Sequence, residues 1–216
     1  MRKKQIELQL TRQVLRPCII ERSFIMSSQN KVKTMTAAAL LCAVGILIPM
    51  YSPIKILIEP ASFTLGSHIA IMIAMFISPT VGIFVALGTS FGFLLSGFPL
   101  VVIMRAFSQI IFITIGALIL KKNNNILLSF KSMIPFVVII SIIHALGEVC
   151  ASLLFYTFNT QTPLIMKNLI LLVGFGTFVH SIIDFSIAYV IWKPLQYVIN
   201  IPANAKIRSN KAKLQA

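Results

Sequence analysis

Long apolar stretches alternate with short polar or proline-containing segments along most of the chain. The first stretch, residues 31–50 (KVKTMTAAALLCAVGILIPM), follows a basic segment and reaches Pro49 near its end. An α-helix rises about 1.5 Å per residue, so about twenty residues match a bilayer core about 30 Å thick. The pattern therefore predicts a transmembrane helix at residues 31–50.

Further apolar stretches of helical length follow, separated by turns and polar connections. They cover approximately residues 64–78, 80–96, 100–120, 133–157 and 168–192. The pattern predicts an all-α membrane protein with six transmembrane helices, in three parts: a basic, disordered N-terminal tail (1–30), a six-helix transmembrane domain (31–196) and a basic cytoplasmic C-terminal tail (197–216). The longest predicted outer connections are residues 51–63 and 158–166, and we expect these two loops to gate whatever site lies beneath them.

Charge and composition fix the class of protein and its orientation. Hydrophobic residues make up 57% of the chain and charged residues 11%, which is typical of multi-pass membrane proteins. A formal net charge of +14 would suggest a nucleic-acid partner in a soluble domain. Here, sixteen of the 19 Lys and Arg residues fall in segments predicted to be cytoplasmic, and two fall in outer loops. This asymmetry predicts that both termini are cytoplasmic, and it accounts for the basic charge without nucleic acid.

Ionisable side chains inside the predicted spans are candidates for function, because a charge at the bilayer centre costs about 2.5–3.5 kcal/mol on insertion scales. Six lie there: His68, Arg105, His144, Glu148, His180 and Asp184. Counting about 1.5 Å per residue from the outer helix ends places the first two of these about 6–9 Å deep and Glu148 about 13 Å deep. The same count places His144 and His180 about 20 Å deep and Asp184 near the inner surface, so we expect His180 and Asp184 to lie away from an outer pocket.

Two interpretations of these groups remain open. In the first, Arg105 and Glu148 form an ion pair that stabilises the helix bundle, and the histidines form hydrogen bonds between helices. In the second, an outward-facing pocket holds a small ligand whose anionic group binds Arg105 through two hydrogen bonds. His68 and His144 would then add hydrogen bonds to the ligand. An aromatic wall would complete this pocket, formed by Tyr51, Phe63 and Phe107.

The sequence contains no signature of an enzyme. It has no HExxH, no GxSxG and no GxxxxGK[ST] motif, so it predicts no catalytic residue, no metal ligand and no cofactor, and the chain cannot use ATP by itself through a phosphate-binding loop. An alternative stays open: a stand-alone membrane protein, either a facilitator or a metal-using intramembrane hydrolase that employs the histidines and their acidic neighbours.

Small residues mark one face of the first predicted helix. Ala39 and Ala43 are four residues apart in the run Ala-Leu-Leu-Cys-Ala, and such a face allows another helix to approach closely in lipid. With six short helices, cytoplasmic ends and long outer loops, residues 31–193 resemble the substrate-binding S components of energy-coupling factor (ECF) vitamin transporters. The run EPASFTLGSHIAIMIAMFISP, residues 59–79, looks like members of this family that handle niacin.

The resemblance implies a function and a set of partners. An S component captures a water-soluble vitamin on the outer face of the bacterial plasma membrane. Its first helix docks through the small-residue face, here Ala39 and Ala43, on a transmembrane coupling subunit that two ATPase subunits drive. An aromatic acid such as niacin would suit Arg105.

Overall fold

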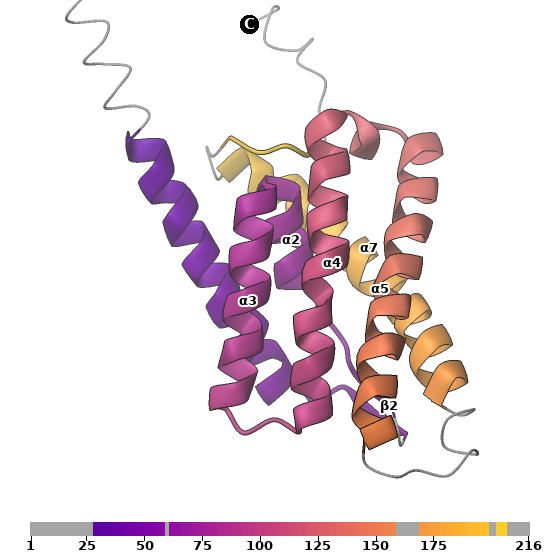
Figure 1. Ribbon diagram of the computed structural model, residues 1–216. Helices are drawn as coiled ribbons and strands as arrows, with labels where there is room; N and C mark the ends of the chain where they lie inside the picture. The colour runs from indigo at the N-terminus through magenta and orange to yellow at the C-terminus, as the bar shows by residue number, and fades with distance from the viewer. Residues whose placement is uncertain (1–27, 59–60, 159–168, 199–201, 207–216) are drawn as a thin grey trace, which may run out of the picture. The chain divides into compact units, whose positions relative to one another are not determined.

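Helices carry nearly all of the chain that the structure describes (Figure 1). This computed structural model describes residues 28–58, 61–158, 169–198 and 202–206. It divides into two units, Met1–Thr36 and Ala37–Ala216, whose boundary lies within the N-terminal helix Ser28–Tyr51. All contacts reported below lie within the second unit.

The predicted helical class is confirmed, and six helices are present in the described residues. Four helices are long and apolar enough to cross a membrane: Ser28–Tyr51, α4, α5 and the continuous helix Ile170–Gln196. In chain order, the elements after the first helix are β1 (Lys55–Ile58), β2 (Ala61–Thr64), α2 (Ile69–Ile77), α3 (Pro79–Leu95), α4 (Leu100–Lys122), η1 (Ile126–Leu128), α5 (Phe130–Phe158), the π-helical segment η2 (Ile170–Phe175) and α7 (Gly176–Val198).

The second predicted span, residues 64–78, differs from the helix observed there. Residues 61–64 belong to β2, a turn follows, and α2 contains only nine residues. At about 1.5 Å per residue, α2 is about 13 Å long, which is roughly half the thickness of a bilayer core. The structure therefore contains a half-length helix where the hydrophobic pattern predicted a full span. The pattern could not distinguish the two, because the strand and the buried turn before α2 are as apolar as the end of a helix.

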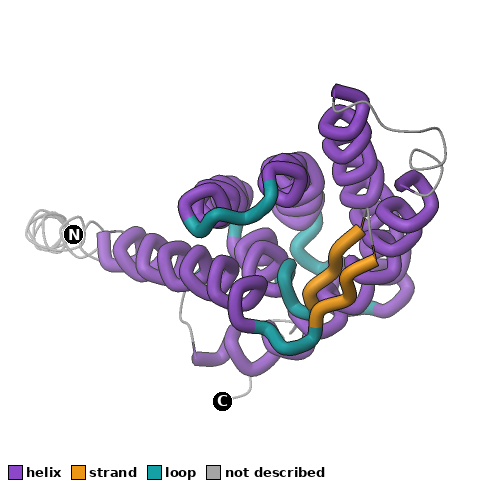
Figure 2. Tube along the Cα trace, turned by 90° about the horizontal axis from the view of Figure 1, so that it is seen from below, coloured by secondary structure: helices purple, strands orange, loops and turns teal. Residues whose placement is uncertain are grey.

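A β-hairpin occupies the connection after the first helix, where the sequence predicted only a loop. Its strands are antiparallel and pair Lys55 with Thr64 and Ile58 with Ala61. Figure 2 shows both strands lying across one end of the helices behind them. The hairpin thereby lies at this end of the second unit, where β2 contacts η2 and α7.

The short helix α2 is held at its other end by a segment from the C-terminal part of the chain. The backbone N–H groups of Asn204 and Ala205 donate to the carbonyl oxygens of Ile77 and Phe76, at 3.0 and 2.9 Å. Trp192 Nε1 donates to the Ala205 carbonyl oxygen at 3.2 Å. These bonds satisfy carbonyl groups that would otherwise lack partners at a helix C-terminus. They fix α2 at the end of the bundle away from the hairpin, so its N-terminus lies at mid-height.

Glycines allow the first helix and α3 to pack closely. A Cβ atom on Gly88 would lie 2.6 Å from Cys42 Sγ, and one on Gly45 would lie 2.5 Å from Thr89 Cγ2. Close approach through small residues is a common basis of helix association in lipid. The hydrophobic effect does not drive helices together there, so van der Waals packing between them becomes important. The glycines of α3 therefore position the first helix along the bundle.

Some predicted segments lie outside the described residues. These are most of the predicted N-terminal tail (1–27), the outer connection at 159–168 and the end of the C-terminal tail (207–216). The cytoplasmic location of both termini stays a prediction.

Substituting Gly88 with Leu is expected to lower the free energy of unfolding by about 1–3 kcal/mol, because the larger side chain must displace Cys42 and its helix. Thermal unfolding of the detergent-solubilised protein measures this loss. Phe84→Leu changes a neighbouring exposed position on the same helix and serves as the control. Equal melting temperatures for the two variants would contradict close packing at Gly88.

Candidate functional site

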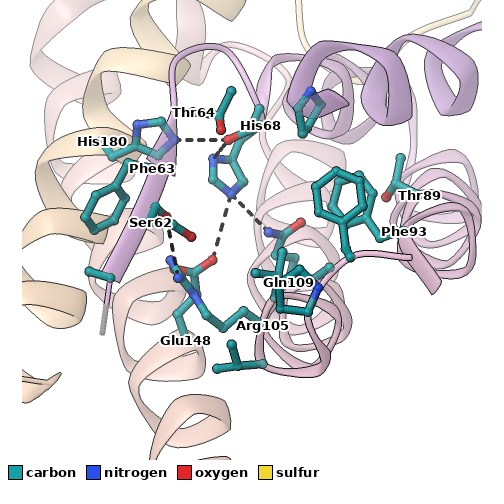
Figure 3. Close-up of a pocket in the computed structure, with 18 of the residues that line it drawn as sticks. Ser62, Phe63, Thr64, His68, Thr89, Phe93, Arg105, Gln109, Glu148 and His180 are labelled. Carbon is teal, nitrogen blue, oxygen red and sulfur yellow. Dashed lines mark hydrogen bonds and ion pairs between the residues drawn. The ribbon is translucent and has the colours of Figure 1, made fainter. Parts of the chain in front are cut away.

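A cavity of about 610 Å³ lies beneath the hairpin, between the first helix, α2, α3, α4, α5 and α7. This volume falls within the range of about 300–1,000 Å³ that is typical of small-molecule sites. Its walls combine aromatic rings with buried polar groups (Figure 3). The side chains used in the argument below are Phe63, His68, Phe93, Arg105, Gln109, Glu148 and His180.

Asp184 on α7 organises the start of α2. Its Oδ1 accepts a hydrogen bond from the backbone N–H of Gly66, and its Oδ2 accepts one from the backbone N–H of His68, both at 2.9 Å. Gly66 has a φ of +84°, a conformation that side chains disfavour, so a glycine is required in this turn. The carboxylate is fully buried, and it binds the N–H groups that a helix N-terminus leaves free.

The same carboxylate orients two histidines. His68 Nδ1 lies 3.1 Å from Asp184 Oδ2, and His180 Nε2 lies 3.2 Å from the same oxygen. An ionised carboxylate only accepts hydrogen bonds, so these contacts place a proton on His68 Nδ1. His68 Nε2 then accepts the hydrogen bond from the Gln109 amide at 3.0 Å. Figure 3 shows the His68 ring between His180 and Gln109, with Nε2 directed toward Glu148.

Arg105 and Glu148 form a buried ion pair beside the hairpin. Arg105 Nη2 and Nε donate to Glu148 Oε2 at 2.7 and 3.2 Å, and both residues are less than a tenth exposed. Thr177 Oγ1 donates to the same carboxylate oxygen at 2.6 Å. Arg105 Nη1 has only a long contact, 3.5 Å, to the Ser62 carbonyl oxygen. The guanidinium therefore faces the cavity with donor capacity beyond its ion pair.

Phe63 on β2 covers this ion pair. The Arg105 Cζ atom lies 5.7 Å from the centre of the Phe63 ring, a cation–π distance. A Cβ atom on Gly176 would lie 2.5 Å from Phe63 Cζ, so the glycine at the start of α7 makes room for the ring. The π-helical segment η2 directly precedes it, and such segments are frequent at functional sites.

The sequence-predicted site residues separate into two groups. Arg105, Glu148, His68 and Phe63 line the cavity together. His144 is fully buried behind it, 3.4 Å from Glu148 Oε1. Two aromatic residues lie away from the cavity lining: Tyr51 is 75% exposed and Phe107 packs against Phe91.

His180 and Asp184 lie closer to the cavity than the depth count predicted. His180 lines it, and Asp184 binds His68 directly. The count was wrong because it treated every span as crossing from the outer surface, whereas α2 begins at mid-height after the hairpin and turn. His68 therefore meets the middle of α7 and not its outer end.

The sequence analysis missed three residues of the site: Gln109 and Phe93 line the cavity, and Thr177 donates a hydrogen bond to Glu148. Gln109 lies four residues after Arg105, on the same face of α4, and Thr177 lies one turn before His180. A search for uncharged polar residues one helical turn from each ionisable residue would have found both. Phe93 carries no comparable signal, because one more phenylalanine in an apolar helix is typical of lipid contact.

Ala39 and Ala43 lie on the outer face of the first helix. Both are exposed, whereas Ala38, Gly45 and Pro49 of the same helix are buried against the bundle. The small-residue pair predicted from the sequence is thus available on the surface of the second unit.

Comparison with known proteins decides the family. No protein-family model and no solved structure matches the chain. The chain is 38% identical to the niacin transporter NiaX of Lactococcus lactis subsp. cremoris (strain MG1363) over 200 residues, which cover 91% of this chain and 90% of that protein. The chain belongs to the NiaX family. This confirms the resemblance to S components of ECF transporters.

Membership of the NiaX family has two direct consequences. The chain is a transport protein and not an enzyme, which removes the intramembrane hydrolase from consideration. It is also a multi-pass membrane protein, in agreement with its long apolar helices.

Replacing Asp184 with Asn is expected to lower the free energy of unfolding by about 1.5–3 kcal/mol, because an amide can accept only one of the two backbone hydrogen bonds and turns an N–H group toward the other. Thermal unfolding in detergent measures the loss. Ser186→Ala is the control, since Ser186 is exposed on the same helix. A melting temperature unchanged from wild type would show that Asp184 does not hold the turn.

Proposed function

We propose that this protein captures niacin in the cavity beneath the hairpin and delivers it to the cell as the S component of an ECF transporter. The observation that carries the proposal is Arg105, a buried guanidinium in the wall of the cavity. The relatedness to NiaX supports niacin as the ligand, because that protein is a niacin transporter.

Arg105 suits the carboxylate of niacin. Glu148 neutralises the guanidinium and holds it through Nε and Nη2, so Nη1 remains to meet a ligand oxygen. A charge-assisted hydrogen bond to a fixed arginine discriminates a carboxylate from an amide, because an amide brings no negative charge. In this arrangement Glu148 positions Arg105 and does not contact the ligand.

The aromatic rings around the cavity suit the pyridine ring. Phe63 and Phe93 line opposite sides of the cavity, and Figure 3 shows the polar groups of His68 and Gln109 between them. An aromatic ligand between two apolar rings buries most of its surface, while a few polar groups fix its orientation. The His68–Gln109 pair would then meet the polar edge of the ring.

The distribution of basic residues supports an outward-facing cavity. Lys121 and Lys122 end α4 at the opposite end of the bundle from the hairpin. Basic residues favour the cytoplasmic side of a membrane, so this position of the two lysines supports an orientation in which the hairpin end faces outward. The hairpin would gate the cavity, together with the connection at 158–166, which lies mostly outside the described residues.

Coupling to transport would use the exposed face of the first helix. Ala39 and Ala43 present no bulky side chain there, so a helix of the coupling subunit can approach closely. That subunit and its two ATPases would supply the energy that this chain cannot draw from ATP itself.

Arg105→Lys keeps the charge but removes the planar guanidinium, and it should weaken niacin binding by about 1–3 kcal/mol, the size of a charged hydrogen bond. Isothermal titration calorimetry of the purified protein measures this change. Nicotinamide should bind poorly to wild type and respond little to the substitution. If Arg105→Ala lowers the melting temperature but leaves the niacin affinity unchanged, Arg105 is a structural ion-pair partner and the proposed site is wrong.

Replacing both Ala39 and Ala43 with Trp should abolish niacin uptake by cells while the niacin affinity of the purified protein stays within a few-fold. The expected cause is steric exclusion of the coupling subunit from the exposed helix face. Uptake of radiolabelled niacin and co-purification with the ATPase subunits measure the effect. Leu146→Trp, at another exposed position, controls for surface bulk. Loss of affinity with an intact complex would contradict this assignment.

A further inference from the structure

Three buried side chains, His68 and Glu148 of the cavity wall and His144 behind it, bring possible metal-ligand atoms close together. His144 Nε2 lies 3.4 Å from Glu148 Oε1, and His68 Nε2 lies 3.9 Å from the same oxygen. All three atoms lie within 4.8 Å of one another. In a tetrahedral zinc site with Zn–N distances of 2.0–2.1 Å, ligand atoms are about 3.3 Å apart, so small side-chain movements would bring this set to that spacing.

The far sides of both imidazole rings are anchored. His68 Nδ1 lies 3.1 Å from Asp184 Oδ2, and His144 Nδ1 lies 3.2 Å from Ser181 Oγ. With Nδ1 donating to these oxygens, Nε2 of each ring carries a lone pair that points toward Glu148. Carboxylate and hydroxyl partners on the far nitrogen are the usual supports of metal-binding histidines.

One of these lone pairs has no hydrogen-bond partner among the described residues. His144 Nε2 is buried, and its nearest ionisable neighbour is Glu148 Oε1 at 3.4 Å. An unsatisfied buried polar atom costs about 1–3 kcal/mol. A cation between His144 and Glu148 would satisfy this nitrogen, and Glu148 Oε1 is free to bind it since the donors from Arg105 and Thr177 both use Oε2.

The net charge of the buried groups is compatible with a bound cation. Around this point the buried ionised groups are Arg105, Glu148 and Asp184, which sum to one negative charge when the histidines are neutral. A divalent cation changes this sum to one positive charge, and a ligand with one carboxylate then returns it to zero. Neutralisation matters here, because uncompensated buried charge is costly in a low-dielectric environment.

We propose that His68, His144 and Glu148 bind a divalent first-row transition-metal ion, of which zinc is the best match, with an open coordination position toward the cavity. Two imidazole nitrogens and one carboxylate oxygen are typical ligands of zinc sites with an open position. The ion would replace the Gln109 N–H as the partner of His68 Nε2, and rotation of that amide would direct its oxygen toward the ion.

A second possible group, His68, His180 and Asp184, fits a cation less well. Both oxygens of Asp184 already accept backbone hydrogen bonds that hold the start of α2. Binding a cation there would break contacts that position the helix.

The direct test is cobalt and zinc binding by the full-length wild-type protein, purified in detergent with a tag that contains no histidine. After chelation and buffer exchange, one equivalent of Co²⁺ should produce the visible absorption bands of a tetrahedral site, and Zn²⁺ should abolish them. Elemental analysis of the zinc-loaded protein should give about one ion per chain. If the wild-type protein binds neither ion, the proposal is wrong, and no variant is needed to show it.

Variants locate the site. His144→Gln should weaken Co²⁺ binding by more than about 100-fold. Loss of a residue that only hydrogen-bonds to a metal ligand typically weakens metal binding by about 10–100-fold, so a larger loss identifies His144 as a ligand itself. Ser152→Ala, a buried position two turns along the same helix, is the matched control and should bind Co²⁺ like wild type. Circular dichroism and melting temperature establish that each variant is folded. If His180→Gln loses the cobalt bands and His144→Gln keeps them, the ion occupies the second group and the proposal is overturned.

The effect of the metal on vitamin capture rests on the proposed function and is measured separately. Zinc-loaded protein should bind niacin at least about tenfold more tightly than chelated protein, because the ion neutralises the carboxylate. Niacin binding without any metal binding overturns only the metal site. Metal binding without niacin binding in either form supports the metal site and overturns niacin as the ligand.

Discussion

The site depends on one buried carboxylate, that of Asp184. It binds the backbone N–H groups of Gly66 and His68 and the rings of His68 and His180. A negative charge in the middle of an apolar bundle is costly unless it is paired and hydrogen-bonded, and these four contacts provide that compensation. Because two of these contacts come from the backbone of the turn that precedes α2, the same charge that orients the histidines also determines where this helix begins. Loss of the carboxylate would therefore change the fold and the cavity together.

The half-length of α2 has a structural consequence. A full-length second span would have placed its N-terminus at the membrane surface, and the cavity beneath the hairpin would be filled by helix. Instead the hairpin and turn occupy the outer half, and the polar backbone of the helix start lies inside the bundle. Irregular backbone is tolerated at membrane depth only where it is buried in protein or lines a cavity. Both conditions hold here, since Ser67 and His68 line the cavity and Asp184 binds the free N–H groups.

Sequence reasoning predicted the helical class, the family, and a set of ionisable residues that the structure largely brings together. Arg105 and Glu148 could be proposed as an ion pair because the outer ends of their long helices are recognisable in the sequence, so residue counts give similar depths for both. Asp184 could not be placed, because its depth relative to His68 depends on the length of α2. A β-hairpin, a tight turn at Gly66 and a short helix share the apolar composition of a full span. Tyr51 and Phe107 were chosen by composition near helix ends, and side-chain direction decides whether such residues reach a cavity.

The first helix connects the cavity to the face proposed for coupling. Gly45 and Pro49 line the cavity, whereas Ala39 and Ala43 are exposed on the same helix, toward its N-terminus. At Gly45 and Gly88 this helix packs closely against α3, with the Thr89 and Cys42 side chains in the space that a Cβ atom would need. A closely packed contact of this kind leaves little room for one helix to move independently of the other. A ligand that fills the cavity next to Gly45 and Pro49 would therefore restrict the position of the same helix that presents the alanines. Capture and coupling would then be linked through one rigid element, with no need for a signal to cross the bundle through the buried ion pairs.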